Sequence, residues 1–228
     1  MINVSIIVPV RNGEAFLYKS IKNLIHCTSY SDEIIYVDDN STDQSLKILK
    51  EMQKLHRRII IKRNPGMGLV DALNHGVDSS TNDWIARFDV DDEYPEDRLK
   101  EQKRFINLNV VAIFCDYEFR GANDEYLGKV PSPVFDEAIK VSFQRSQRTP
   151  HPGALFSKES FYKVGGYLKS DFPVEDLSLW VRMSREGKII SVPKSLLYYR
   201  LHSNSVTAKK RESIENKKNL ILKKYLYF

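Results

Sequence analysis

The sequence predicts an α/β fold built on a mostly parallel, doubly wound sheet. Short, continuously apolar runs rich in β-branched residues alternate along the chain with segments that carry apolar residues at helical spacing. This alternation is typical of parallel strands covered by helices on both faces. With 228 residues, 42% of them hydrophobic and 29% charged, the chain has room for one such domain and a short appendage.

The order of the elements follows from the same patterns. The predicted strands are the apolar runs at residues 4–10, 33–39, 58–63, 84–89 and 110–116. The predicted helices lie between them, at residues 14–27, 41–55, 67–78 and 95–108. Ser41, Thr42 and Asp43 offer N-caps for the second helix, and Pro95 suits the first turn of the fourth. Ligands of such sheets bind beyond the carboxyl ends of the strands.

The positive charge of the chain is concentrated at its C-terminal end. Residues 209–228 contain seven basic and two acidic residues, a net charge of +5 that equals the formal net charge of the whole chain. A nucleic-acid-binding protein would carry basic residues over its folded body, so we expect no nucleic-acid partner. The pattern predicts a basic amphipathic helix over residues 206–228.

One face of this predicted helix is apolar and is flanked by lysines, as in helices that lie on a membrane surface. The apolar residues that can share the face are Ile214, Ile221, Tyr225 and Phe228. A solvated helix and a contact between the subunits of a homodimer are the alternatives. The N-terminus has no basic leader, and no run reaches the roughly 20 apolar residues of a membrane span, so we expect a cytoplasmic protein, peripheral at the inner face of the membrane.

Two groups of acidic residues close predicted strands. Asp38 and Asp39 end the second strand, whereas Asp89, Asp91 and Asp92 follow the fourth, so both groups are expected on one rim of the sheet. In an extended turn the side chains of Asp89 and Asp91 project to one side. Two carboxylates together suit Mg²⁺ or Mn²⁺. The alternative is that these acids cap the next helix or are solvated.

No dedicated phosphate-binding loop is found in the sequence. The pattern GxxxxGK[ST] is absent, and Gly66-Met67-Gly68 lacks the third glycine and the preceding strand of a dinucleotide-binding motif. We expect these glycines to form a turn. Cys27 and Cys115 lie far apart in apolar segments and are expected to be reduced and buried.

A second pair of acids opens a predicted helix farther along the chain. Glu175 and Asp176 precede Leu177, Trp180 and Val181, which fall at helical spacing. The helix dipole at this end favours ionised carboxylates, which suits a general base. Alternatively, the two acids are ordinary partners of the helix dipole.

Together these segments resemble the family 2 glycosyltransferases, which have the GT-A fold and use nucleotide sugars. The resemblance covers roughly residues 3–205 and rests on IIVPVRNGEAFL, YVDDNSTDQSL, ARFDVDDE, and GGY followed by EDLSLWVR, in this order. It implies a GT-A domain over 1–205, with a nucleotide-binding half at about 1–116 and an acceptor half at about 117–205.

The resemblance also implies roles for individual residues. In the nucleotide-binding half, the base and ribose would be held by Pro9, Arg11, Glu14, Asp38 and Asp39. Asp89 and Asp91 would match the DxD motif, with Asp91 as the direct contact to Mn²⁺ or Mg²⁺. Asp176 of the Glu175-Asp176 pair would be the catalytic base.

Further along the chain the implied roles concern the metal and the acceptor. His202 would complete the metal shell, as a C-terminal histidine does in some GT-A enzymes. His151, Gly166 and Tyr167 would line the acceptor cleft, although the prolines around His151 are equally consistent with a loop turn. Asn40 and Ser178 depart from the common pattern, standing where glycine and a third acid are usual.

The expected function is therefore transfer of one sugar, with inversion, from a nucleoside-diphosphate sugar, UDP first among them, to a saccharide acceptor. We expect that acceptor to be linked to a lipid diphosphate in bacterial O-antigen, capsule or lipooligosaccharide assembly. A sugar nucleotidyltransferase and a non-catalytic nucleotide-sugar-binding subunit are the alternatives. The first should carry a glycine-rich basic loop after the first strand, and VRNGEAF has a single glycine.

Overall fold

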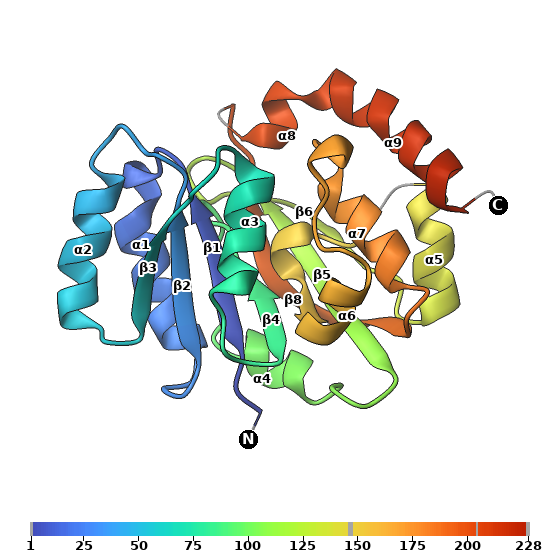
Figure 1. Cartoon of the computed structure of the whole chain (residues 1–228), viewed down its shortest axis with the longest axis horizontal. Helices are drawn as coiled ribbons and strands as arrows, with labels where there is room; N and C mark the ends of the chain where they lie inside the picture. The colour runs from blue at the N-terminus through green and yellow to red at the C-terminus, as the bar shows by residue number, and fades with distance from the viewer. Residues whose placement is uncertain (1, 146–147, 204, 227–228) are drawn as a thin grey trace.

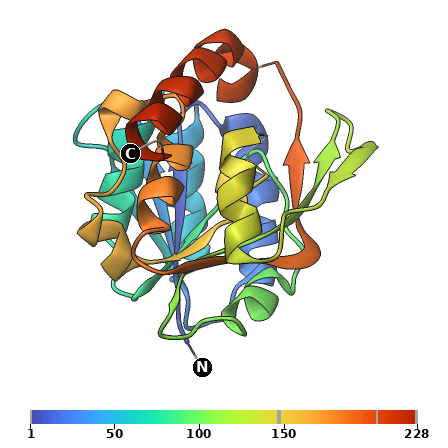
Figure 2. The ribbon, with the colours of Figure 1, turned by 90° about the vertical axis from the view of Figure 1, so that its right-hand side faces the viewer.

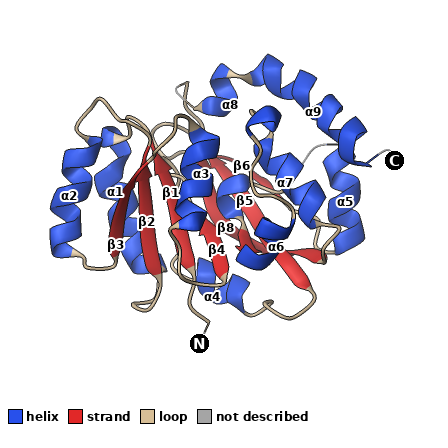
Figure 3. Ribbon diagram, viewed as in Figure 1, coloured by secondary structure: helices blue, strands red, loops and turns tan. Residues whose placement is uncertain are grey.

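The computed structural model describes residues 2–145, 148–203 and 205–226. Helices lie on both sides of one central sheet (Figures 1 and 3). In chain order, the strands and helices are β1 (Ser5–Val10), α1 (Glu14–Cys27), β2 (Glu33–Asp38), α2 (Ser45–Leu55), β3 (Ile59–Arg63), α3 (Leu69–Asp78), β4 (Trp84–Arg87), α4 (Arg98–Lys103), β5 (Val110–Arg120), β6 (Tyr126–Val130), α5 (Asp136–Arg145), β7 (Leu155–Ser157), α6 (Lys158–Lys163), α7 (Glu175–Met183), β8 (Lys188–Arg200), α8 (Val206–Lys209) and α9 (Arg211–Leu226).

The sheet has a parallel half and a half that is largely antiparallel. Its strand order is β3-β2-β1-β4-β7-β5-β6, and β8 pairs in parallel with β5. The first four strands are parallel, whereas β7 runs antiparallel to both β4 and β5. The predicted α/β fold is confirmed, and all five predicted strands are present.

Two hydrophobic cores fill the spaces on either side of the sheet. On β1, Ile7 belongs to the core that contains residues of α3, α6, α7 and α9. Its neighbours Ile6 and Val8 belong to the other core, with residues of α1, α2 and α4. Burial on both faces explains why these strands read as continuous apolar runs rather than as alternating ones. Cys27 and Cys115 are buried free thiols, as predicted.

Three strands of the sheet, β6, β7 and β8, were not predicted or were predicted only in part. β7 has three residues and β6 is largely exposed, so neither carries a periodic signal that could identify it. The long β8 strand begins at Lys188, well before the strand-like residues 195–200. The fourth predicted helix, at residues 95–108, is shorter in the structure, where α4 covers Arg98–Lys103.

The C-terminal segment is helical, and its apolar face is packed inside the domain. Ile221 and Leu222 of α9 are 2% and 5% exposed and belong to the same core as α7, and Ile214 and Tyr225 pack against that core. Figure 1 shows α9 running above α5 and α7. The apolar face that we expected on a membrane surface is therefore buried within the protein, and Phe228 lies outside the described residues.

Basic residues of the C-terminal segment remain exposed to solvent. They are Lys209 of α8, Lys210 and, on α9, Lys223 and Lys224; Leu220 of α9 is exposed as well. Lys224 Nζ lies 3.6 Å from Asp171 Oδ1 of the domain. Within the described part of the chain, none of the helices has the length and apolar character that a membrane crossing requires.

Candidate active site

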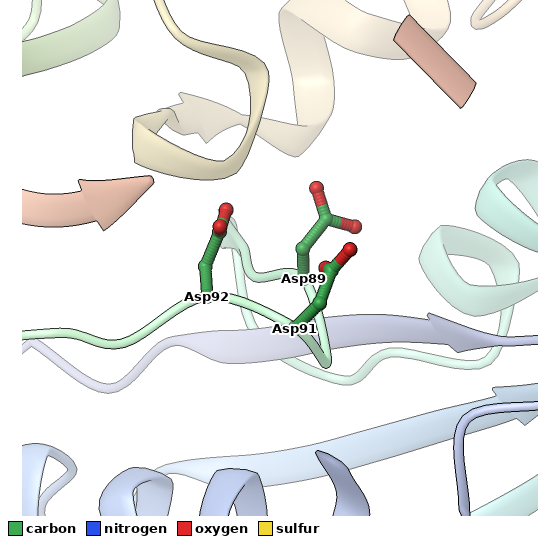
Figure 4. A group of neighbouring side chains, drawn as sticks. All are labelled: Asp89, Asp91 and Asp92. Carbon is green, nitrogen blue, oxygen red and sulfur yellow. The ribbon is translucent and has the colours of Figure 1, made fainter. Parts of the chain in front are cut away.

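Three carboxylates gather in the loop that follows β4. Ligand atoms of Asp89, Asp91 and Asp92 all lie within 4.8 Å of one another. Figure 4 shows the three side chains rising from this loop on the same side. The loop begins where β4 ends, at the carboxyl rim of the parallel strands, which is where the sequence predicted a ligand site.

Asp89 is held by a buried arginine that the sequence analysis did not single out. Arg87, the last residue of β4, has a side chain that is 2% exposed, and its Nη2 donates to Asp89 Oδ1 at 2.6 Å. Burial and the neighbouring Asp91 raise the pKa of Asp89, while Arg87 opposes the shift. An arginine within the apolar run WIARFD was the available signal, because a buried guanidinium requires partners.

Asp92 is the most buried of the three acids. It is 3% exposed, and its Oδ1 accepts a hydrogen bond from the backbone N–H of Arg200 at 2.9 Å. Its Oδ2 is buried and has no hydrogen-bond partner. Burial, together with Asp91 and Asp89, raises the pKa of Asp92 well above its usual range. An unsatisfied carboxylate oxygen beside two other acids is stabilised by a cation, so the donor set fits Mg²⁺ or Mn²⁺.

His202 lies beside Asp91, as the metal-shell hypothesis requires. Its Nε2 is 2.7 Å from Asp91 Oδ2, and the two side chains are 16% and 25% exposed. The ring of Phe16 on α1 packs against the imidazole with centroids 5.4 Å apart. The end of β8 thus brings a nitrogen ligand to a carboxylate that comes from the loop after β4.

The acids at the end of β2 lie below the surface of the rim. Asp38 is fully buried and its Oδ2 lies 3.7 Å from Arg63 Nε. Asp39 Oδ1 accepts from Asn64 Nδ2 at 2.7 Å and from the Gly68 N–H at 2.9 Å, so it fixes the turn before α3. Its Oδ2 lies 3.4 Å from Nη1 of Arg11, whose side chain is 58% exposed. The Arg63 side chain is 62% exposed, so Arg11 and Arg63 are both groups here that a ligand can reach.

Two further predicted nucleotide-binding residues and Asn40 lie near this rim. Pro9 is buried within β1. Glu14 is exposed, and its Oε2 accepts from the Gln44 N–H at 2.6 Å, which joins α1 to the start of α2. Asn40 has a φ of 54°, in the left-handed region that asparagine tolerates, so it replaces the usual glycine without difficulty.

Glu175 and Asp176 form the first turn of α7, and their surroundings differ from the expectation. Glu175 is 4% exposed, with a buried Oε2 that has no hydrogen-bond partner. Burial, followed by the charge of Asp176, raises the pKa of Glu175 to about 8, so the helix dipole does not keep this carboxyl ionised. Asp176 Oδ1 accepts from the backbone N–H of Leu177 at 2.7 Å. Asp89 and Arg87 also act on Glu175 electrostatically, which links α7 to the loop after β4.

The residues predicted to line the acceptor cleft lie close together. Tyr167 is 3% exposed, and its OH lies 2.8 Å from Nε2 of His151, which is partly exposed. The backbone of Tyr167 is held on both sides by the amide of Asn74, at 3.0 and 2.9 Å. Gly166 has a φ of 65°, which favours glycine. Burial and then Arg87 lower the pKa of His151 well below its usual range, so the imidazole is neutral. Their role at the acceptor stays a prediction.

The sequence is similar to those of known glycosyltransferases. The family model of Glycosyl transferase family 2 matches residues 5–165. The chain is 24% identical over 215 residues to TuaG of Bacillus subtilis, which is assigned as a teichuronic acid biosynthesis glycosyltransferase, and the match covers 91% of this chain and 82% of TuaG.

Solved structures show the same fold. The crystal structure of S. aureus TarS 1-349 in complex with UDP-GlcNAc matches with a TM-score of 0.75 at 16% identity, over 96% of this chain and 65% of that one. Mannosyltransferase PcManGT from Pyrobaculum calidifontis, in complex with GDP-Man and Mn²⁺, matches with a TM-score of 0.73 at 18% identity, over 93% of this chain and 61% of that one. This chain thus spans less than two thirds of either structure. The predicted GT-A fold and the assignment to the glycosyltransferases are confirmed: the chain belongs to glycosyl transferase family 2.

Proposed function

We propose that the protein transfers one sugar from a nucleoside-diphosphate sugar, with UDP as the nucleotide, to a hydroxyl group of a saccharide acceptor, with inversion and with Mn²⁺ or Mg²⁺ as cofactor. The observation that carries this proposal is the cluster of Asp89, Asp91 and Asp92 after β4, with His202 beside Asp91. Glu175 and Asp176, which begin α7, are the second acidic group of the proposal.

The acids after β4 have the composition of a site for a divalent cation and diphosphate. Asp91, His202 and the unpartnered Oδ2 of Asp92 are the groups that would hold the ion. When bound, the ion supplies Lewis-acid stabilisation of the charge that develops on the departing diphosphate. Arg87 fixes the orientation of Asp89 by donating to Oδ1, so that Oδ2 of Asp89 is directed away from the guanidinium.

Asp176 is the proposed general base. In a single displacement the incoming hydroxyl group loses its proton on the face opposite the leaving group, and a carboxylate that accepts this proton contributes roughly 10² to 10⁴ in rate. Glu175, with a pKa of about 8, holds a proton near neutral pH. Because the Glu175 Oε2 is buried, the adjacent and partly exposed Asp176 is the group that accepts the proton of the acceptor.

The C-terminal helix and the relatives support the proposal for the acceptor and its setting. The exposed lysines of α8 and α9 suit an anionic surface, such as the headgroups around a lipid-diphosphate-linked saccharide. The similarity to TuaG supports a role in the assembly of a bacterial surface polysaccharide. The protein would then act at the inner face of the cell membrane through its charge alone, because the apolar face of α9 is occupied.

The two alternative functions make different predictions for one assay. UDP-sugars are incubated with the protein and Mn²⁺, and free UDP is measured with and without saccharide acceptors. The proposed function requires UDP release that depends on Mn²⁺ and increases with an acceptor. Production of a nucleoside triphosphate when pyrophosphate is added would indicate a nucleotidyltransferase, and binding without any turnover would indicate a non-catalytic subunit.

A further inference from the structure

A cluster of three aromatic rings lies on the sheet next to the acids. Tyr117 and Phe119 of β5 pack edge to face with centroids 5.3 Å apart. The ring of Tyr199 on β8 lies 5.8 Å from that of Phe119 and 6.3 Å from that of Tyr117. In the parallel register of the two strands, Phe119 and Tyr199 are direct partners. We refer to these three rings as the aromatic ledge.

The aromatic ledge is open on one side. All three side chains are partly exposed. On the other side of β5, the residue opposite Phe119 is Gly128 of β6, and a Cβ atom there would meet nothing within 4 Å. Figure 2 shows the β5–β6 hairpin projecting from the edge of the domain beside the end of β8. Space therefore remains over the ring of Phe119 for a ligand.

The inner end of the aromatic ledge adjoins the acids. Tyr199 precedes Arg200, whose backbone N–H donates to Asp92 Oδ1 at 2.9 Å. After burial, the charges of Asp92, Asp89 and Asp91 contribute to raising the pKa of Tyr199, so the phenol stays protonated. Val90, from the loop that carries the acids, packs against the same core as Tyr117 and Tyr199. The aromatic ledge thus extends outward from the proposed site of sugar transfer.

Polar groups stand at the rim of the aromatic ledge. The hydroxyl oxygens of Tyr199 and Thr207 are 3.2 Å apart. Burial raises the pKa of Tyr117, and the nearby positive charge of the exposed Arg148 opposes that shift. A surface with aromatic faces at its centre and hydroxyl and guanidinium groups at its rim matches a pyranose ring, which has an apolar C–H face and hydroxyl groups around its edge.

We propose that Tyr117, Phe119 and Tyr199 form the subsite that binds a pyranose ring of the saccharide acceptor. This inference rests on the proposed function and adds to it the direction from which the acceptor enters, along the β5–β6 hairpin. The ring stacks on Phe119 and Tyr199, and the hydroxyl group that receives the sugar is directed inward, toward the acids after β4. The rim groups bind the other hydroxyls.

The test measures binding of simple pyranosides by saturation-transfer NMR, with methyl β-glucoside, methyl β-galactoside and methyl β-N-acetylglucosaminide as probes, in the presence of UDP and the diamagnetic Mg²⁺. Wild-type protein should transfer saturation mainly to the C–H protons of one face of at least one sugar. Phe119→Ala should weaken binding of that sugar about tenfold, whereas Phe119→Tyr, which keeps the ring, should retain it.

A matched control comes from the same hairpin. Tyr126 of β6 is 59% exposed, and it pairs with Arg120, whose guanidinium carbon lies 5.6 Å from the Tyr126 ring centroid. The Arg120 guanidinium also lies over the ring of Tyr198, the neighbour of Tyr199, so Tyr126 lies with Arg120 and Tyr198 and not with Phe119 and Tyr199. Tyr126→Ala should leave pyranoside binding unchanged.

Calorimetry of UDP with Mn²⁺ on the same variants separates this inference from the proposed function. UDP affinity should be the same in the wild type, Phe119→Ala and Tyr126→Ala. If UDP binds but none of the pyranosides does, or if Phe119→Ala and Tyr126→Ala have equal effects, the aromatic ledge is not an acceptor subsite. If UDP does not bind to the wild type, the proposed function itself fails.

Discussion

His202 and Asp91, 111 positions apart in the sequence, lie with Nε2 and Oδ2 at 2.7 Å. The contact joins the end of β8 to the loop after β4. Because the imidazole and the carboxylate are both ligands of divalent cations, the pair accounts for the position of His202 just beyond the last strand. It also makes the histidine testable apart from the carboxylates.

His202→Gln should weaken Mn²⁺-dependent binding of UDP by about 10- to 100-fold, since the loss of a ligand or of its immediate support has effects of that size. UDP binding without metal should change little. Calorimetry with and without Mn²⁺ measures both. His26→Gln, at an exposed position on α1, is the control, and equal effects of the two substitutions would contradict a role at the metal.

Glu175 should make the stability of the protein depend on pH. Its pKa is raised from 4.5 to about 8 in the folded state, so the folded protein holds a proton that the unfolded chain releases. Stability is therefore highest below the unfolded pKa, falls as the pH rises toward about 8, and stays low above it. At about 1.4 kcal/mol per pH unit, the total loss amounts to a few kcal/mol.

Glu175→Gln removes this titration and keeps the shape of the side chain. In urea unfolding between pH 5 and pH 9, the variant should gain stability relative to the wild type as the pH rises. Parallel stability curves for the two proteins would show that Glu175 does not have a raised pKa.

Asp176→Asn should reduce kcat by about 10² or more and leave the affinity for UDP and Mn²⁺ nearly unchanged, because the group acts on the proton of the acceptor in the transition state. Steady-state kinetics and calorimetry on the same preparation provide the two readouts. A large loss of UDP affinity would instead assign Asp176 to the donor site.

The basic residues of the C-terminal segment should bind anionic lipid without contributing to the fold. Replacing the exposed Lys209, Lys210 and Lys223 by Ser should reduce sedimentation with anionic vesicles, since each lysine near such a surface contributes about 1 kcal/mol at low salt. The temperature of unfolding should change little. Unchanged vesicle binding would contradict the membrane role, and a halved mass in light scattering would indicate that these residues join a homodimer.

Leu222→Ala is the complementary variant in the same helix. Leu222 is 5% exposed in the core, so its truncation should lower the free energy of unfolding by about 2–5 kcal/mol. The same burial means that removal of the whole segment would destabilise the domain, and a deletion could not separate lipid binding from folding.

The elements that the sequence predicted are those whose signal is local. β1, β2 and β4 are almost wholly buried, and β3 and β5 are buried in part, so their apolar runs stand out. The acids that end β2 and follow β4 were assigned to one rim of the sheet by topology alone. β7 was not predicted because three residues are too few to show a periodic pattern of apolar side chains. It nevertheless joins the two halves of the sheet by pairing antiparallel with both β4 and β5.

Contacts between residues far apart in the sequence were not predicted. The hydrogen bond from the Gln44 N–H to the Glu14 carboxylate is one of them. Burial of Arg87 against Asp89, and of the apolar face of α9 against α7, depends on contacts that no local pattern contains. The sequence shows that such a group or face needs a partner, and the fold decides which partner it has.

Asp91→Asn is the sharpest test of the proposed cation site after β4. The substitution keeps the size of the side chain and removes the charge of the carboxylate that contacts His202. Calorimetry of UDP with and without Mn²⁺ is compared between the wild type, Asp91→Asn and the control Asp97→Asn, whose carboxylate pairs with Lys194 on the surface. If Asp91 binds the cation, Mn²⁺ strengthens UDP binding in the wild type and in Asp97→Asn but has little effect in Asp91→Asn. An equal enhancement by Mn²⁺ in all three proteins would contradict it.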